Sequence, residues 1–229
     1  MQLNTYASSA ELNQSFARQL HQLLADAIDS RGAAYLVVSG GRTPQALFQQ
    51  LSQMELAWDK VTITLADDRF LPVDAADSNE RLVRATLLQD KAAAANFVSL
   101  YADYANAAEA VPSLLSRVAQ LPTFDAVILG MGEDGHTASL FPCSRELAQG
   151  LADDAPDLLA VQPTTAPYQR ISFSKRRLLN SRALFLHLVG PAKLEVLQQA
   201  QAGTDVMAMP IRAFIHQADV ALSVQFTAN

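Results

Sequence analysis

The segment Leu129–Pro142 holds the residues of this chain that are best suited to chemistry. It follows the apolar run Phe124–Leu129, which predicts a short buried strand. Asp134 and His136 lie in the turn after that strand, among glycines that let the backbone turn sharply and approach a ligand: Gly130, Gly132 and Gly135. A turn built only for packing has no need of both an acid and a base. The pattern therefore predicts a hydrolytic site in which His136 acts as a general base.

A second glycine turn, Gly40–Pro44, lies between a predicted strand at 34–38 and the helix that follows it. Free backbone N–H groups and the positive end of a helix dipole favour an anion at such a turn. Arg42 and Thr43 add donors, and Thr43 is also a good N-cap with Pro44 at the first helical position. An ordinary tight turn explains the same residues equally well, so this motif alone leaves both interpretations open.

Charged residues at other element ends supply further candidates for an anion site. The run Asp67–Arg69 follows a predicted strand at 61–65, and Arg170 opens a later strand. Lys193 falls in the first turn of a predicted helix, where a cation opposes the helix dipole and a bound anion would compensate. For Asp67–Arg69 and Lys193, a solvated charge is an equally good explanation. The basic run Lys175–Arg177 is interpreted as a solvated face.

The glycine spacing at 130–135 also matches the dinucleotide-binding fingerprint, Gly-x-Gly-x-x-Gly. That fingerprint is expected in the first βαβ unit, whereas this match lies past the middle of the chain. Glu133 and Asp134 would also repel a pyrophosphate, so a nicotinamide or flavin enzyme is disfavoured. No set of His, Cys and acidic residues has metal-ligand spacing. The remaining histidines are predicted to be structural or surface groups: His21, His187 and His216.

Strands and helices alternate along the chain. Strands are predicted at 34–38, 61–65, 96–101, 124–129, 170–173, 183–189 and 220–224, and helices from Ser8 to Arg31, after Thr43, at 78–88, up to Gln120, at 191–201 and around 211–216. This order predicts an α/β fold with a largely parallel sheet covered by helices on both faces. Ligands of such sheets lie beyond the carboxyl ends of the strands, where the motifs at 39–44, 67–69 and 130–136 all fall. A single domain over residues 1–229 is expected.

Composition limits the partners of the chain. Of 229 residues, 50% are hydrophobic and 17% are charged, and the formal net charge is −6. An acidic surface argues against nucleic acid as the main partner, because phosphate neutralisation needs basic residues. The single cysteine, Cys143, fits a reducing compartment and is interpreted as an incidental loop thiol. The sequence has neither a signal pattern nor a run of about 20 apolar residues, so a cytoplasmic protein away from membranes is expected. A monomer or a weak dimer is expected as well.

Taken together, these motifs resemble the 6-phosphogluconolactonase family, part of the wider superfamily of sugar-phosphate isomerases and deaminases. The likeness rests on Leu129–Pro142 above all, and extends over nearly the full chain in the right order: Ser39–Pro44, Asp67–Arg69 with Pro72 and Ser78-Asn79, Arg170-Ile-Ser, and Gly190-x-x-Lys193. It implies a three-layer, modified Rossmann-like fold with a mostly parallel sheet and a small flanking subdomain. It also implies hydrolysis of 6-phospho-D-glucono-1,5-lactone to 6-phosphogluconate in the pentose phosphate pathway, without metal or cofactor.

Carried over by position, the resemblance implies a role for each candidate residue. His136 would be the general base that activates water, and Asp134 would help to orient the site. The residues that would hold the phosphorylated sugar lactone are Gly40, Gly41, Arg42, Thr43, Asp67, Arg69, Gly132, Arg170 and Lys193. Two positions depart from the family pattern: Asp68 stands where glutamate is usual, and Cys143 stands where glycine is usual.

Two rival functions belong to the same superfamily. Glucosamine-6-phosphate deaminases share the Asp-Gly-His core, but they typically continue it with an Ile-Ala-Phe-Asn-Glu type of sequence. This chain continues with Thr137–Phe141 instead, which favours the lactonase. A sugar-phosphate sensor domain is the non-enzymatic rival, and it is disfavoured because a sensor has no need of the base.

Overall fold

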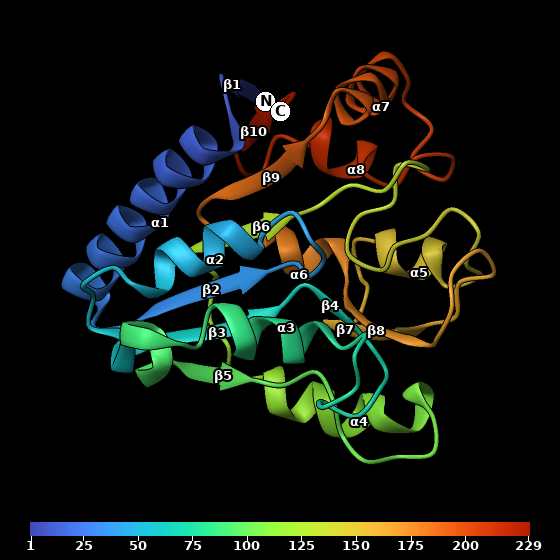
Figure 1. The fold of residues 1–229 in the computed structure, drawn as a ribbon. Helices are drawn as coiled ribbons and strands as arrows, with labels where there is room; N and C mark the ends of the chain where they lie inside the picture. The colour runs from blue at the N-terminus through green and yellow to red at the C-terminus, as the bar shows by residue number, and fades with distance from the viewer.

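A parallel sheet of seven strands forms the centre of the protein, whose computed structural model describes residues 1–229 (Figure 1). The strand order is β1-β10-β9-β6-β2-β3-β5, and every neighbouring pair is parallel. The strands are β1 (Gln2–Tyr6), β2 (Ala34–Val38), β3 (Val61–Leu65), β5 (Asn96–Val98), β6 (Ala126–Leu129), β9 (Leu184–Val189) and β10 (Leu222–Thr227). The predicted largely parallel sheet is therefore confirmed.

Helices cover both faces of this sheet. The connections that lead from β1 towards β5 carry α1 (Ser9–Arg31), α2 (Gln45–Ser52) and α3 (Asn79–Thr86), which pack on one another in that order. The later connections run back across the sheet. Because parallel crossovers are right-handed, their helices lie on the opposite face: α4 (Ala107–Val118), α6 (Lys175–Leu179), α7 (Pro191–Ala202) and α8 (Arg212–Ile215). The short helix α5 (Leu147–Leu151) lies beyond the carboxyl ends of the strands and packs on α6. Short 3₁₀ turns occupy Trp58–Lys60 and Asp90–Ala94. No helix combines the length and the apolar character that a bilayer crossing requires.

A small antiparallel sheet flanks the main one. It consists of β4 (Asp67–Arg69), β8 (Arg170–Phe173) and β7 (Leu158–Val161), in the order β4-β8-β7. The segment 170–173 is thus a strand, as predicted, but it belongs to this second sheet and not to the parallel one. The run 67–69 is also a strand here, and it pairs with 170–172 so that Arg69 lies opposite Arg170.

Local sequence signals explain several element ends. The Ser8 hydroxyl accepts from the Glu11 backbone N–H at 3.2 Å to cap α1, and Gly32 ends that helix in the left-handed region at φ 80°. At α2 the prediction is wrong by one residue, because Pro44 is the N-cap and no side chain caps the helix. Thr43 lies just before it and is exposed.

The core extends through both sheets. A continuous cluster of buried apolar side chains includes members of the parallel strands and also Ile171 and Phe173 of β8. Arg177 is embedded beside it, which corrects the interpretation of 175–177 as a solvated face. Its guanidinium lies 3.9 Å from the centre of the Phe124 ring, and Nη2 donates to the carbonyl oxygens of Leu121 and Pro122. The single-domain organisation stays a prediction.

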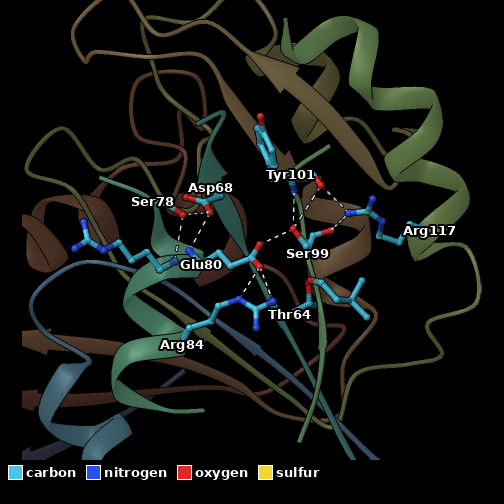
Figure 2. Close-up of polar contacts among 10 residues, drawn as sticks. Thr64, Asp68, Ser78, Glu80, Arg84, Ser99, Tyr101 and Arg117 are labelled. Carbon is cyan, nitrogen blue, oxygen red and sulfur yellow. Dashed lines mark hydrogen bonds and ion pairs between the residues drawn. The ribbon is translucent and has the colours of Figure 1, made fainter. Parts of the chain in front are cut away.

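Helix α3 is anchored by buried carboxylates (Figure 2). Asp68 accepts from the backbone N–H groups of Asn79 and Glu80 at 2.7 and 3.0 Å and from the Ser78 hydroxyl at 3.2 Å. Glu80 in turn accepts from Arg84 at 2.9 Å. It also accepts from the hydroxyl of Ser99, which lies just after β5. These contacts fix the first turn of α3, and with it the position of Asn79.

The sheet order places a topological switch between β2 and β6. From β2 the chain continues outwards to β3 and β5, whereas from β6 it continues in the other direction to β9 and β10. The loops that leave these two neighbouring strands therefore separate and open a crevice at their carboxyl ends. The glycine turn at 39–44 follows β2, and the loop at 130–136 follows β6, so both motifs lie at this crevice.

Candidate active site

A cavity of about 470 Å³ occupies the crevice at the switch point. Its walls come from the loops after β2 and β6, the small sheet, the start of α3 and the start of α7. The residues that line it are Ser39, Gly40, Gly41, Thr43, Pro44, Asp67, Arg69, Asp77, Asn79, Ile128, Leu129, Gly130, Met131, Gly132, His136, Thr137, Ala138, Phe141, Ala166, Pro167, Tyr168, Arg170, His187, Leu188, Val189 and Lys193. Most of the predicted site residues are thus brought together.

The loop after β6 is folded tightly around the His136 side chain. The Gly132 N–H donates to the His136 carbonyl oxygen at 2.9 Å, which closes the turn. A Cβ atom at residue 132 would lie only 2.1 Å from Nδ1 of His136. Glycine is therefore required at 132 because the imidazole occupies the space of a side chain. This is a more specific reason for Gly132 than substrate contact.

Asp134 holds one edge of that imidazole. Its Oδ1 lies 2.5 Å from His136 Nδ1 and 3.1 Å from the backbone nitrogen of the same residue. Burial raises the pKa of Asp134, but the hydrogen bonds from His136 outweigh it and bring this pKa below its usual value. The carboxylate is therefore ionised and can only accept. Nδ1 must then carry the proton, which leaves Nε2 free to accept one.

Cationic side chains converge on the same cavity. Arg170 is only 5% exposed, and its Nε and Nη1 are buried without a hydrogen-bond partner. Burial lowers the pKa of Arg170, with Asp67 opposing, but a guanidinium stays charged in proteins. Arg69 lies opposite Arg170 in the small sheet and Lys193 lines the same cavity; both are half-buried, and the Lys193 ammonium donates to the carbonyl oxygen of Met131 at 2.8 Å. These charges make the cavity suitable for an anion.

The glycine turn after β2 forms another wall. A Cβ at residue 40 would lie 2.0 Å from Oδ1 of Asn79, so glycine lets α3 approach the turn. Gly41 and Thr43 line the cavity, whereas Arg42 is exposed and is not among the lining residues. The structure therefore brings all of the turn's predicted binding residues to the cavity except Arg42.

The two acidic residues of β4 differ in their surroundings. Asp67 lines the cavity, and its Oδ2 accepts from the hydroxyl of Ser139, while Asp68 faces the start of α3. Burial raises the pKa of Asp68 to about 6, Asp67 adds to the rise, and the backbone N–H groups of α3 oppose it. Asp68, the position that departs from the expected family pattern, is therefore not a lining residue and holds the start of α3 instead.

Several lining residues were not singled out as binding residues from the sequence. Asp77 and Tyr168 meet across the rim, where the Tyr168 hydroxyl donates to Asp77 Oδ2 at 2.9 Å. Tyr168 holds a left-handed backbone at φ 70°, a conformation that non-glycine residues adopt mainly at functional or tightly constrained positions. Asn79 and Phe141 were visible only as parts of the family motifs. No local signal indicated Asp77 or Tyr168.

Cys143 lies behind the same wall. Its Sγ lies 3.2 Å from the Thr165 hydroxyl, and it accepts from the Thr164 N–H at 3.4 Å. Burial raises the pKa of this thiol, but hydrogen bonds from Thr165 and Thr164 lower it to about 7. Cys143 thus links two segments of the cavity wall, which is more than the incidental role expected for it.

His187 is buried on β9, as expected for a structural histidine, but it also lines the cavity. Its ring packs edge-on against Phe16 of α1 with centroids 5.6 Å apart, and neither ring nitrogen has a hydrogen-bond partner. Burial lowers the pKa of His187 to about 4. The imidazole is therefore neutral at physiological pH.

This burial predicts how His187→Leu changes the stability of the protein with pH. In the unfolded chain the imidazole binds a proton near pH 6.5, but in the folded protein only near pH 4. The stability associated with His187 is therefore complete above pH 6.5 and is lost as the pH falls towards 4. Between pH 7 and 4.5 the wild type should lose about 2–3 kcal/mol more of its free energy of unfolding than the variant.

Urea unfolding of both proteins at the two pH values measures this difference. The pH dependence of the wild type must be compared with that of the variant, because Asp68 changes stability in the opposite direction. Its pKa is about 6 in the folded protein and 3.8 in the unfolded chain, so its protonation stabilises the folded protein as the pH falls from 6 towards 3.8. Asp68→Asn should therefore make the acid loss of stability steeper than in the wild type. Parallel pH curves for the wild type and His187→Leu would contradict the prediction.

Comparisons with known proteins agree with this geometry. The family model described as glucosamine-6-phosphate isomerases/6-phosphogluconolactonase matches residues 7–223. A 6-phosphogluconolactonase of Rhizobium meliloti (strain 1021) is 42% identical over 226 residues, covering 97% of each chain, and one of Pseudomonas putida is 39% identical over 217 residues, covering 94% of this chain and 90% of the relative.

A solved structure extends the agreement to three dimensions. The crystal structure of a 6-phosphogluconolactonase from Shewanella baltica OS155 is 45% identical and superposes with a TM-score of 0.98. The match covers 100% of this chain and 98% of the other. The predicted three-layer α/β fold is therefore confirmed, and the small antiparallel sheet lies where the resemblance implied a small flanking subdomain. From its sequence, its fold and the loops that build its cavity, this chain belongs to the family of glucosamine-6-phosphate isomerases and 6-phosphogluconolactonases.

Proposed function

We propose that the protein hydrolyses 6-phospho-D-glucono-1,5-lactone to 6-phospho-D-gluconate, a step of the oxidative branch of the pentose phosphate pathway. One observation carries this proposal: His136, whose Nδ1 is held by Asp134, lines the same cavity as the cationic side chains of Arg69, Arg170 and Lys193, whereas Asp134 itself is not a lining residue. A base and an anion site in one cavity suit an ester that carries a phosphate. The names of the relatives support the same substrate.

The reaction uses His136 as the general base. Asp134 keeps the proton on Nδ1, so Nε2 takes a proton from water while the water oxygen bonds to the lactone carbonyl carbon. The tetrahedral intermediate then collapses, and the bond between that carbon and the ring oxygen breaks. The imidazolium returns its proton to the departing oxygen, which becomes a hydroxyl. The new carboxylic acid ionises and releases one proton to solvent.

The phosphate of the substrate supplies binding energy away from the reacting carbonyl. Arg170 has unsatisfied donors in the cavity, and the backbone N–H groups of the Gly40–Thr43 turn add to them. Held at this distant group, the lactone carbonyl is kept in reach of the activated water. Asp67 and Asp77 are placed to accept hydrogen bonds from sugar hydroxyls.

The decisive experiment measures acid release above the spontaneous rate. Freshly made 6-phosphogluconolactone and the unphosphorylated gluconolactone are compared at equal concentration. We expect enzyme-dependent acid release with the phosphorylated lactone and a much smaller increment with the other. Equal increments would remove the phosphate site from the proposal, and ammonia release from glucosamine 6-phosphate would establish the deaminase instead.

A cytoplasmic location and a monomeric or weakly dimeric state complete the proposal.

A further inference from the structure

One face of the His136 imidazole is covered by an aromatic ring. Phe141 stacks on it with ring centroids 4.2 Å apart and an angle of 28° between the planes. Phe141 itself is only 6% exposed. Asp134 already fixes one nitrogen at the edge of the imidazole, but a hydrogen bond to a single ring atom leaves the plane free to tilt. The stacked ring fixes that plane.

A strained turn brings Phe141 back over His136. Leu140 donates its N–H to the Thr137 carbonyl oxygen at 3.0 Å, and between them Ala138 has φ 47°. A left-handed backbone at alanine costs about 1–2 kcal/mol, so the surroundings must hold it in place. The turn is indeed pinned at its centre, because the Ser139 backbone N–H donates to the Ser172 hydroxyl at 3.1 Å.

The same turn is tied to both sheets. The Ser139 hydroxyl donates to Asp67 of the small sheet, and the Thr137 hydroxyl donates to the Gly130 carbonyl oxygen, which follows β6, at 2.8 Å. Strain held by several buried hydrogen bonds indicates a conformation that the fold maintains for a purpose. Its result is the position of Phe141.

Phe141 does not belong to the main core. It forms a separate small apolar cluster with Leu159 and Val161 of β7, next to Cys143. One side of its ring therefore packs on the small sheet, and the other side faces His136.

We propose that Phe141 is a positioning residue that sets the plane of the catalytic imidazole. The proposal rests on the proposed role of His136 as the base. Because Phe141 acts through the imidazole, its loss should affect proton transfer more than substrate binding. The cations that would hold the phosphate remain in place when Phe141 changes.

Phe141→Leu and Phe141→Tyr form a matched pair for the test. Leucine keeps the apolar contacts with β7 but removes the flat ring, whereas tyrosine keeps the ring. Since small misplacements of a reacting group are costly, we expect kcat to fall about 10-fold in the leucine variant with KM within about 2-fold, and we expect the tyrosine variant to stay close to the wild type. Wild-type kcat in the leucine variant would overturn the proposal.

Two further measurements separate positioning from a general structural effect. In wild-type protein, NMR should show the His136 ring protons shifted upfield by the ring current of Phe141, with His136→Ala providing the assignment. The shift should persist in Phe141→Tyr and disappear in Phe141→Leu. Its absence from the wild type would overturn the proposal even if the leucine variant fails to fold.

The double variant His136→Ala/Phe141→Leu completes the test. If Phe141 acts through the imidazole, the leucine change should lower kcat no further once His136 is gone. An equal loss in both backgrounds would overturn the proposal while leaving the base assignment intact. If His136→Ala alone keeps wild-type kcat, the proposed function fails first, so the two failures can be told apart.

Discussion

Turnover of 6-phosphogluconolactone by His136→Ala is expected to fall about 10²–10⁴-fold, the usual contribution of a general base. The imidazole is the only group in the cavity whose position, next to an ionised Asp134 and with Nε2 free, suits it to take a proton from water. KM should change little, because the cations that would hold the phosphate lie on other elements: β4, β8 and α7. This split distinguishes a base from a binding residue.

Initial rates of acid release at saturating lactone, corrected for spontaneous hydrolysis, measure the effect. His216→Ala is the matched control, since His216 is exposed and its Nε2 donates to the Gly203 carbonyl oxygen, 2.9 Å away and outside the cavity. It should retain wild-type kcat and KM. Unchanged kcat in His136→Ala, or an equal loss in His216→Ala, would contradict the assignment of the base.

The sequence predicted the placement of the glycine loops well because their signal is local. A buried apolar strand followed at once by glycines, Asp134 and His136 has few alternatives, and parallel sheets bring such strand ends to one edge. Gly40 and Gly132 show why these positions must be glycine: a Cβ at either would collide with Asn79 or His136. The residue types could be read from the chain, but the colliding partners could not.

Features that depend on distant pairing could not be predicted. Asp67–Arg69 has neither alternating apolar residues nor β-branched residues, and it is a strand only because β8 lies alongside it. Tyr168 and Asp77 meet across 91 residues of sequence. His187 and Arg177 look like ordinary polar residues in the chain, and only packing shows that both are buried. Tertiary contacts override local propensity in each case.

Arg170→Met is expected to raise KM for the phosphorylated lactone at least about 30-fold. In the proposed complex Arg170 and the substrate phosphate form a buried, hydrogen-bonded charge pair, and removing one partner of such a pair costs about 2–5 kcal/mol. Arg170 is 5% exposed and has two buried nitrogen atoms without partners, so its donors are available to a phosphate. kcat at saturation should change less than KM. Methionine has a comparable length and packs readily in a core.

The same substitution should not destabilise the protein without substrate. A buried cation without hydrogen-bond partners is costly, and replacing buried charges with apolar groups is often neutral or stabilising. Urea unfolding should therefore give Arg170→Met a free energy of unfolding equal to that of the wild type or higher. A large loss of stability would mean that Arg170 serves the fold.

Arg177→Met is the matched control, because Arg177 is equally buried but its Nη2 has hydrogen-bond partners, although its Nη1 has none. It donates to the carbonyl oxygens of Leu121 and Pro122 and lies over the Phe124 ring. Its loss should lower the free energy of unfolding by about 1–3 kcal/mol, since two hydrogen bonds and the contact with the Phe124 ring are removed, while KM stays unchanged. Opposite results are therefore expected for the two buried arginines. Arg170→Met should lose substrate binding and keep its stability, whereas Arg177→Met should lose stability and keep substrate binding. Only a charge kept open for a ligand explains that opposition, so similar behaviour of the two variants would exclude Arg170 from the phosphate site.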